Sequence, residues 1–337
     1  MISKKKVRLS DIAQKLNIST VTVSKALSNK EGVSDDLRKE IKELAESMGY
    51  QKLSDSGKTT GNVGILIPSH FFSAHFSYYW YLFNFLSKEL LAQNFYSIME
   101  LITDQDEEAS VLPRILTDKK VDGLIILGQV KENYIEEINR NFENFILMDF
   151  YTNNTLIDSV SNDNFYCSYI MTNYVIKSGH KNLRFVGNFN ATTSIKDRFM
   201  GFEKALLENN LECDKNLILD DRDQKGNLIE IELPSTKEMP TAFICNNDIT
   251  AARLVHQLHK QGYKVPDDIS VTGFDNFLGQ QTISVPLTTV YIKPEDSAKV
   301  AADLIIAKIE GRPYIKGRHV VSGSLLIRDS VKNISEK

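Results

Sequence analysis

The sequence has few cysteines, no long apolar run and none of the common signals for export. Its three cysteines, Cys167, Cys213 and Cys245, are odd in number and far apart, and none belongs to a C-x-x-C pair. Such thiols are typical of free, buried cysteines in a reducing cytosol. No stretch approaches the length of a transmembrane helix, and the basic N-terminal residues precede no apolar signal core. The sequence therefore predicts a cytoplasmic protein without membrane contact.

Motifs for enzyme chemistry are also missing. There is no P-loop, no G-x-S-x-G elbow, no H-E-x-x-H zinc motif and no Rossmann glycine triplet. His256 and His259 form a close pair, but no acidic or cysteine partner accompanies it, so a surface role is favoured over a metal site. Asp149 and Asp275 lack the nucleophile or metal motif that an acid–base pair would need. We therefore expect no enzyme, no cofactor and no metal.

The composition is that of a globular protein whose charge is unevenly distributed. Of 337 residues, 42% are hydrophobic and 25% are charged, and the length fits two or three domains. The net charge is −4, but residues 1–60 hold 12 Lys or Arg against 8 Asp or Glu, which gives +4 there and −8 in the remainder. A basic head on an acidic body favours a small nucleic-acid-binding module joined to a domain that does not touch phosphates.

Residues 8–50 predict three short helices. The first ends near Asn17, the second begins at Ser19 or Thr20, and the third covers 34–48. Each has an apolar side, so the three can pack as one small domain. Shape alone leaves open a packing domain whose polar face is only solvated.

The second of these helices has two unlike sides on a helical wheel. Val23, Ala26 and Leu27 form an apolar side for burial against the other helices. The opposite side carries hydroxyl groups, one methyl-bearing side chain and one cation, which suit the base edges of a major groove. We expect base contacts from Thr20, Val21 and Lys25, and phosphate contacts from Ser19, Thr22, Ser24 and Asn29.

The letters S-T-V-T-V-S-K-A-L at 19–27 resemble the helix-turn-helix of the LacI/GalR transcription regulators. In that family the following segment carries a short helix that forms on DNA and inserts a Leu side chain into the minor groove. Here Gly57-Lys58-Thr59 is present, but the segment before it is shorter and Leu53 is its one apolar candidate. A shortened linker is therefore expected at 51–61, and either DNA is read without the minor-groove wedge or the linker folds differently.

Beyond the linker, short apolar runs alternate with amphipathic stretches. This alternation favours parallel sheets covered by helices on both faces, and the length is too great for one such sheet, so two α/β lobes are expected. The expected strands are 63–67, 96–101, 124–127, 145–148, 183–186, 242–245 and 269–274, and the expected helices include 107–119, 131–141, 165–178, 194–209, 248–262 and 295–310.

Polar side chains follow these strands, at the edge where open α/β sheets bind ligands. Each alone is more often a helix cap than a ligand contact. Together with Arg198 on a nearby helix they form a ring of carboxylates, amides and hydroxyls that suits the vicinal hydroxyls of a sugar. The residues are Ser69-His70, Asp104, Asp149, Asn188, Asn246-Asn247-Asp248 and Asp275-Asn276.

A series of short motifs makes this body resemble the effector-binding core of the LacI/GalR family, which has the fold of periplasmic sugar-binding proteins. They include V-D-G-L-I-I at 121–126, R-F-M-G-F at 198–202, G-F-D-N at 273–276 and R-D-S at 328–330. The resemblance covers about 7–331. It implies a small all-α helix-turn-helix head followed by an α/β core of two doubly wound parallel-sheet lobes.

The resemblance also implies where the domains divide. Residues 1–50 would form the DNA-binding domain, 51–61 the linker and 62–331 the effector-binding and dimerisation core. The chain would cross between the lobes near Asn162, Tyr291 and Ser322. The N-lobe would hold about 62–162 and 292–321, and the C-lobe about 163–291 and 322–331.

The same resemblance assigns effector contacts residue by residue. One departure is Ile292, where relatives often have Gln or Arg. Aromatic rings stack on pyranose faces, so Phe71 and Phe72 are further candidates, whereas most aromatic residues beyond Phe76 are expected to pack in the core or against a second subunit. The implied effector-contacting positions are Ser69, Asp149, Arg198, Asn247 and Asp275, with Asn162 at a crossover facing the cleft.

The sequence thus predicts a sequence-specific DNA-binding transcription regulator, a repressor of carbohydrate-utilisation genes whose operator affinity depends on a small sugar-like effector. No heptad tail follows the core, so a homodimer on a pseudo-palindromic site is expected. The alternatives are a sugar-binding receptor of transport or chemotaxis, which would need export, and a sugar-converting enzyme, which would need a catalytic motif.

Overall fold

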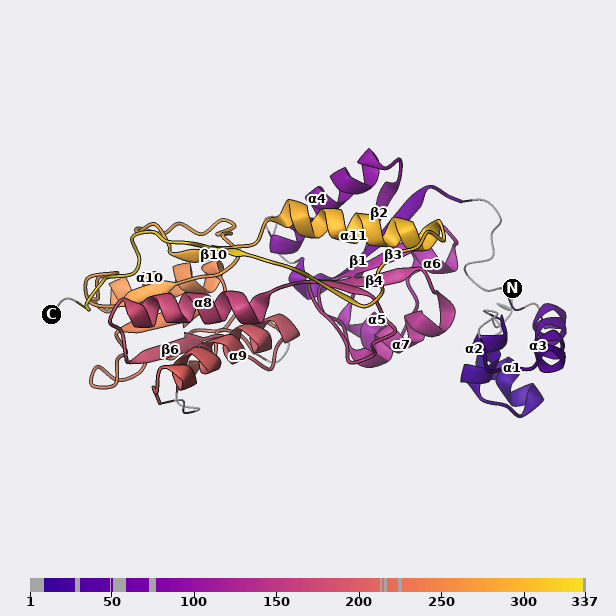
Figure 1. Cartoon of the computed structure of the whole chain (residues 1–337), viewed down its shortest axis with the longest axis horizontal. Helices are drawn as coiled ribbons and strands as arrows, with labels where there is room; N and C mark the ends of the chain where they lie inside the picture. The colour runs from indigo at the N-terminus through magenta and orange to yellow at the C-terminus, as the bar shows by residue number, and fades with distance from the viewer. Residues whose placement is uncertain are drawn as a thin grey trace.

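The computed structural model describes residues 9–27, 31–48, 50, 59–72, 77–212, 214, 217–223 and 226–335. These residues form a helical head and two α/β units, which follow one another along the long axis of the molecule (Figure 1). We call the two α/β units the N-lobe and the C-lobe. The predicted order of a helical head and an α/β core with parallel sheets is confirmed.

The head is a three-helix unit with its own small core. Ile12, Val23, Ala26 and Ile41 are fully buried where the three helices meet, and they come from the apolar side of each helix. The guanidinium of Arg38 donates to the carbonyl oxygens of Ala26 (3.3 Å) and Val33 (3.3 Å), and so ties the last helix to the end of the one before it. The helices are α1 (Leu9–Leu16), α2 (Thr20–Leu27) and α3 (Asp35–Ser47).

The N-lobe is built on a six-stranded parallel sheet in the order β11-β5-β4-β3-β1-β2. Alternate residues of its central strands face opposite sides. Ile65 and Ile67 pack against α4 (Tyr78–Ala92) and α11 (Pro294–Ile309), whereas Leu66 packs against α6 (Arg114–Thr117) and α7 (Glu132–Asn141). The strands are β1 (Asn62–Pro68), β2 (Tyr96–Ile102), β3 (Gly123–Leu127), β4 (Phe145–Met148), β5 (Ser159–Asn162) and β11 (Arg318–Val321), and the remaining short helices are η1 (Ser69–Phe71) and α5 (Asp104–Glu108).

The C-lobe repeats this plan on a four-stranded parallel sheet in the order β7-β6-β8-β9. Phe243 and Cys245 of β8 pack against α10 (Asp248–Lys260), whereas Ala242 and Ile244 face α8 and α9. The helices α8 (Asn164–Lys177) and α9 (Thr193–Glu208) therefore cover one face and α10 the other (Figure 1). The strands are β6 (Leu183–Val186), β7 (Ile218–Leu219), β8 (Ala242–Cys245) and β9 (Ser270–Thr272).

Three segments carry the chain between the lobes. The first leads from β5 into α8, the second from β10 (Thr289–Tyr291) into α11, and the third from β11 into β12 (Ser324–Leu326). The antiparallel pair β10 and β12 lies beside α8, where Met171, Val290 and Ile292 share a small buried cluster. This cluster packs α8 against the β10–β12 pair beside the boundary between the lobes.

One predicted helix is wrong in detail. Residues 107–119 do not form a single helix, because α5 ends at Glu108 and α6 begins at Arg114. Ser110 has a φ of 50°, which does not fit a right-handed helix. Pro113, directly before α6, has no backbone N–H to donate, so a helix cannot run through it without losing a hydrogen bond. None of the helices in the described part of the chain has the length and apolarity to cross a membrane.

Candidate functional site

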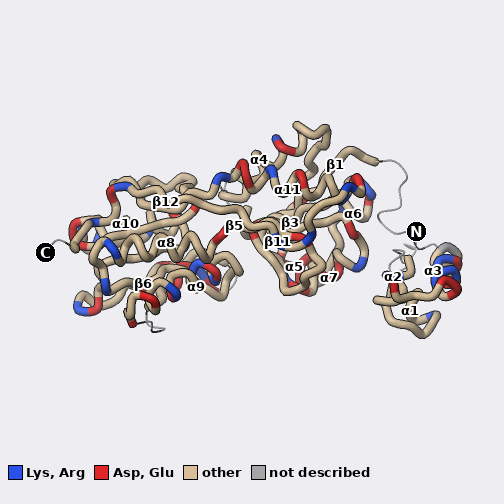
Figure 2. Tube along the Cα trace, in the orientation of Figure 1, with Lys and Arg blue, Asp and Glu red and all other residues tan. Residues whose placement is uncertain are grey.

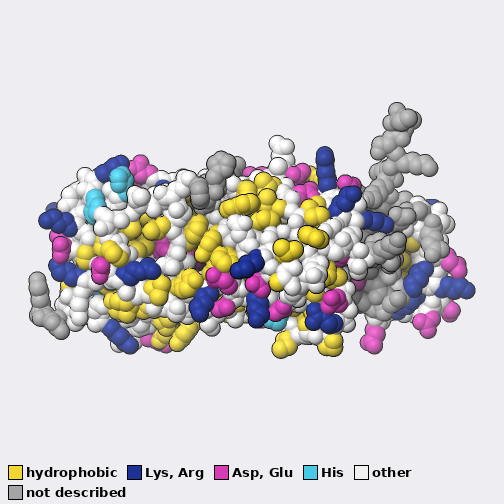
Figure 3. All heavy atoms as spheres, turned by 90° about the horizontal axis from the view of Figure 1, so that it is seen from above, with side chains coloured by type: hydrophobic (Ala, Val, Ile, Leu, Met, Phe, Trp, Pro, Cys, Tyr) yellow, Lys and Arg dark blue, Asp and Glu magenta, His cyan; other side chains and the backbone are white. Residues whose placement is uncertain are grey.

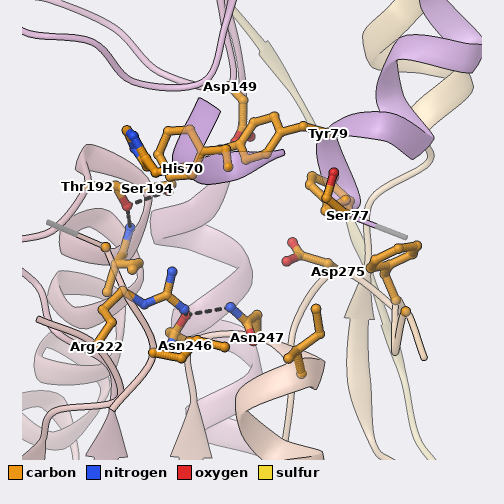
Figure 4. A pocket seen from close by; sticks show the side chains of 18 of the residues that line it. His70, Ser77, Tyr79, Asp149, Thr192, Ser194, Arg222, Asn246, Asn247 and Asp275 are labelled. Atoms are coloured by element: carbon orange, nitrogen blue, oxygen red, sulfur yellow. Dashed lines mark hydrogen bonds between the residues drawn. The ribbon is translucent and has the colours of Figure 1, made fainter. Parts of the chain in front are cut away.

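A cavity of about 480 Å³ lies between the two lobes (Figure 4). The N-lobe contributes residues from η1, from the start of α4 and from the turn after β4. The C-lobe contributes residues from the start of α9, from the loop after β7, and from the turns that follow β8 and β9. The lining residues include His70, Phe71, Tyr79, Asp149, Thr192, Ser194, Arg198, Arg222, Asn246, Asn247 and Asp275.

Arg198 and Asp275 form a buried ion pair in the C-lobe wall of this cavity. The Nη2 of Arg198 lies 2.9 Å from Oδ1 of Asp275, and the side chains are only 6% and 11% exposed. Arg198 also donates to Oδ1 of Asn164 (2.8 Å) and to the carbonyl oxygen of Asn246 (2.6 Å), and it lies over the ring of Phe274 at 3.8 Å. The guanidinium is therefore fixed in orientation. Burial raises the pKa of Asp275, while Arg198 lowers it.

Asp149 faces the cavity from the N-lobe, in the turn after β4. Its backbone has a φ of 71°, and its carboxylate accepts hydrogen bonds from the Tyr79 hydroxyl (2.9 Å) and from Nδ2 of Asn162 (3.3 Å). The pKa of Asp149 is raised to about 6, mainly by burial and also by the nearby Asp275, while Arg198 and the hydrogen bond from Tyr79 act in the opposite direction. The remaining lone pairs of Asp149 and Asp275 can accept hydrogen bonds from ligand hydroxyl groups.

Aromatic rings make up the apolar part of the cavity wall. The rings of Phe71 and Tyr79 lie 4.8 Å apart, and Tyr78 meets Phe277 edge-on at 5.6 Å. Tyr78 and Tyr79 pack against the N-lobe core, as predicted for most aromatic residues beyond Phe76, and in addition they line the cavity.

Some of the predicted effector contacts lie outside the cavity wall. Phe72 packs edge-on against Trp80 at 5.6 Å, and Ser69 does not line the cavity either. Asn162 is 4% exposed and acts behind Asp149, with its own Oδ1 accepting from Ser297 (3.1 Å). Their roles as effector contacts stay predictions. Asn247 lines the cavity and caps α10 by accepting from the backbone N–H of Thr250 (2.8 Å).

Arg222 is a cavity residue that sequence reasoning missed. It forms an ion pair with the neighbouring Asp221 (2.7 Å), whose carboxylate is fully buried and also accepts from Asn246 (2.9 Å) and Thr250 (2.6 Å). These contacts lower the pKa of Asp221 despite the opposing effect of burial. The sequence around Arg222 contains no recognisable motif. The residue reaches the cleft only because the folded chain places the loop after β7 there. His70, which the sequence places among the polar residues at the strand ends, lines the cavity and pairs with Asp104 at 3.3 Å.

Ile292, where relatives often have Gln or Arg, does not line this cavity. It is 1% exposed and packs in the buried cluster beside β10. Among the described residues no group of three His, Cys, Asp or Glu side chains is arranged to hold a metal ion. Cys167 and Cys245 are buried, and Cys213 lies outside the described residues.

The head presents the predicted polar face of α2 to solvent. The hydroxyl of Ser19 accepts from the backbone N–H of Thr22 (3.0 Å) and so caps the helix. Val21 is 61% exposed, Lys25 is exposed, and Thr20 and Ser24 are partly exposed. Figure 2 shows that most of the charged residues described in the head lie along α3, whereas α2 carries a single charged residue, Lys25. The predicted contact Asn29 and the candidate wedge Leu53 lie outside the described residues.

The chain is fixed to the N-lobe where it enters the core from the head. The two carboxylate oxygens of Asp122 accept from the backbone N–H groups of Thr60 and Gly61, each at 2.8 Å. A charge-assisted pair of this kind sets the direction of the backbone that connects head and core. The chain is therefore bound to the N-lobe at Thr60 and Gly61.

Two families match the chain, one in the head and one in the core. Residues 8–52 match the family described as bacterial regulatory proteins, lacI family, and residues 172–331 match a periplasmic binding protein-like domain. The HTH-type transcriptional repressor PurR of Photobacterium profundum is 25% identical over 97% of this chain and 99% of its own length. The protein of the same name from Histophilus somni is 26% identical over the same shares.

Solved structures share the fold along nearly the whole chain. A complex of the transcriptional regulator CelR with cellobiose superposes with a TM-score of 0.70 at 19% identity, covering 96% of this chain and 100% of that one. The lac repressor dimer bound to operator and the anti-inducer ONPF gives a TM-score of 0.67 at 18% identity, covering 97% and 100%. The chain therefore combines a head that matches the lacI family of bacterial regulatory proteins with a core that matches a periplasmic binding protein-like domain, and it aligns with PurR repressors along almost its whole length.

Proposed function

We propose that this protein is a DNA-binding transcription repressor whose operator affinity is controlled by a small sugar-like effector bound between the lobes. The observation that carries the proposal is the cavity at the lobe boundary, in which Asp149 of one lobe faces the Arg198–Asp275 pair of the other. A ligand held by both lobes stabilises their closed arrangement, because it loses contacts when they separate. We infer that carbohydrate-utilisation genes are the targets.

In this proposal the exposed face of α2 reads DNA. Thr20, Val21 and Lys25 contact base edges in the major groove, since Val21 suits a thymine methyl and Lys25 suits guanine acceptors. The remaining hydroxyls, together with Asn29, contact phosphates and fix the register of the helix. The phosphate-contacting side chains are Ser19, Thr22, Ser24 and Asn29.

The effector contacts divide by chemistry. Asp149 and Asp275 accept from sugar hydroxyls, and Asn247 offers an amide at the cavity wall. Phe71 provides a ring for the apolar face of a pyranose. Ser69, Phe72 and Asn162 are proposed on the family resemblance, with Asn162 acting through Asp149. The CelR structure contains cellobiose, which supports a carbohydrate for this cavity.

We further propose a homodimer in which residues 1–50 are the DNA-binding domains and 62–331 the dimerising cores, joined by 51–61. The N-lobe, as divided above, exposes apolar side chains on α4 and on the open edge strand β2, including Tyr96 at 66% and Leu91 at 57% exposure. Figure 3 shows apolar side chains exposed on the face of the molecule where α4 lies. A patch of this kind marks a protein interface. The lac repressor was solved as a dimer on its operator.

The proposal places the protein in the cytoplasm, as a regulator without catalytic activity. The relatives are named as transcription repressors. The alternative is a sugar-binding receptor of transport or chemotaxis type, which would use the same cleft but not the exposed face of α2.

Selection from a random duplex library, followed by fluorescence anisotropy of the full chain, tests the proposal. The protein should retain duplexes at low salt and prefer the selected sequences over scrambled ones. A thermal-shift panel of mono- and disaccharides should then raise the melting temperature with some of them. Failure to retain any duplex, together with a saccharide-induced shift, would instead support the receptor alternative.

A further inference from the structure

The carboxylate of Asp197 lies across the boundary between the lobes. Asp197 belongs to α9 of the C-lobe, and its Oδ1 accepts from the hydroxyl of Tyr151 at 2.7 Å. Its Oδ2 lies 3.4 Å from Nη2 of Arg318. Tyr151 follows β4 and Arg318 begins β11, so both partners belong to the N-lobe. One carboxylate therefore binds the two lobes together outside the ligand cavity.

The two N-lobe partners are held ready for this contact. The guanidinium of Arg318 lies over the ring of Tyr151 at 3.8 Å, and its Nε donates to Oγ of Ser161 at 3.0 Å. Because these contacts stay within the N-lobe, Tyr151 and Arg318 do not have to be ordered by Asp197. The side chain of Asp197 is 17% exposed, so the contact is only partly screened by water.

A second contact ties the same end of α9 to the N-lobe. The backbone N–H of Thr193, in the first turn of α9, donates to Oε1 of Gln129 at 2.7 Å. The first N–H groups of a helix have no partner within the helix, so this one is available for the other lobe. The N-terminal half of α9 is thus bound to the N-lobe at two points, Thr193 and Asp197.

The next residue along the helix faces the ligand cavity. Arg198 holds Asp275 in the cavity wall, whereas Asp197 does not line the cavity. Consecutive helical residues are separated by about 100°, so one turn of α9 can direct one side chain to the N-lobe and the next to the cleft. Separation of Asp197 from Tyr151 would therefore move α9, and with it Arg198, away from the N-lobe wall that carries Asp149.

We propose that Asp197 is a positioning residue that sets the resting closure of the cleft through its contact with Tyr151 and Arg318. It acts through α9 on the placement of Arg198 and does not touch the ligand. The proposal stands on the geometry of the lobe boundary, so it holds or fails independently of the DNA-binding and sugar-binding functions.

Native-state hydrogen exchange of the full chain without ligand tests the proposal. In Asp197→Asn, the peptide containing Thr193 should exchange about fivefold faster, the size expected for a partly exposed interaction of this kind. Tyr151→Phe, which removes one hydroxyl group, should give a similar change, and the double variant should exchange no faster than the faster single variant.

Glu208→Gln provides the matched control. Glu208 lies on the same helix and also accepts from a tyrosine, Tyr169 at 2.6 Å, and pairs with a cation, but all of these partners belong to the C-lobe. This variant should leave exchange at Thr193 unchanged. Unchanged exchange in both Asp197→Asn and Tyr151→Phe would overturn the proposal, as would additive effects in the double variant. Equal acceleration in Glu208→Gln would also overturn it, because a general loosening of α9 would then explain the data.

Discussion

Arg198 and Asp275 are 77 positions apart in the sequence, yet they meet in a two-point ion pair at 2.9 and 3.4 Å. Arg198 projects from α9, and Asp275 lies in the turn after β9 with a φ of 90°. The pair links the helix that borders the N-lobe to the turn that carries Phe277 toward Tyr78. It therefore fixes the C-lobe wall of the cavity before any ligand arrives.

Replacing Arg198 by methionine should strongly destabilise the core. The Arg198→Met variant keeps the length of the side chain but leaves the buried Asp275 carboxylate without its cation. Loss of one partner from a buried ion pair costs about 3–5 kcal/mol of unfolding free energy. Urea unfolding at pH 7 measures the loss. Lys204→Met, which removes a cation of the exposed Lys204–Glu208 pair on the same helix, should have little effect, and equal losses in the two variants would contradict this account.

Asp149 should make the stability of the core depend on pH. Its folded pKa of about 6 lies above the ordinary aspartate value of 3.8, so protonation favours the folded state. The stabilisation from this group is complete below about pH 4 and is lost as the pH rises through 6. Asp149→Asn should therefore lose less stability than the wild type between pH 4 and pH 7, as measured by urea unfolding.

Asp106 provides the control for this pH dependence. Hydrogen bonds from the side chain and backbone of Thr103 lower the pKa of Asp106. The stability that this carboxylate gives the folded state is therefore lost only as the pH falls below the ordinary pKa of an aspartate. Across pH 4–7, Asp106→Asn should run parallel to the wild type. Parallel curves for Asp149→Asn as well would mean that the Asp149 carboxyl titrates normally in the folded protein.

Lys25→Ala should weaken binding to selected duplexes far more than binding to scrambled ones. Loss of a base contact costs about 1–3 kcal/mol at the position it reads, whereas loss of a phosphate contact lowers affinity for all sequences alike. Anisotropy titrations at a fixed salt concentration measure both. Lys260→Ala removes the same charge from the exposed end of α10 and should leave both affinities unchanged. Equal losses on the two duplexes for Lys25→Ala would reassign Lys25 to a phosphate.

Arg38→Ala should unfold the head without affecting the core. Arg38 donates to carbonyl oxygens at the end of α2 and in the turn before α3, and each hydrogen bond to a charged group contributes about 1.5–3 kcal/mol when well formed. Affinity for selected and scrambled duplexes should fall together, because the whole reading helix loses its support. Arg38→Lys keeps the charge but not the forked geometry and should rescue little. Full DNA affinity in Arg38→Ala would exclude this supporting role.

Several of the strands that the sequence predicts are apolar and buried on both faces, although the edge strand β2 is also predicted and is partly exposed. β1, β3, β4 and β8 read as continuous apolar runs because helices cover both sides of a parallel sheet. The sequence does not predict β5 as a strand, because S-V-S-N is a polar stretch, although all four of its residues are buried in the fold. Its serines are accommodated by contacts that form only in the folded chain, such as the one from Arg318 to Ser161.

The sequence predicts where the ligand cavity lies, but it does not predict all of the residues that line it. Asp149, Asn247 and Asp275 could be placed because each directly follows a buried strand, where the sheet edge gathers side chains. Arg222 could not be placed, since it reaches the cleft through a loop and depends on the buried Asp221. The sequence does not distinguish Tyr79 from its aromatic neighbours. Only the orientation of α4 about its own axis, which depends on the folded core, places the Tyr79 hydroxyl beside Asp149.

The response of DNA affinity to a bound saccharide tests the central claim most directly. Anisotropy titrations of the full chain on a selected duplex should be repeated at saturating concentrations of a saccharide that raises the melting temperature. Coupling between the cleft and the head predicts a change in DNA affinity of about 5- to 150-fold, with an equal and reciprocal effect of the duplex on saccharide affinity. An unchanged DNA affinity, with both ligands demonstrably bound, would show that the cleft does not control the head.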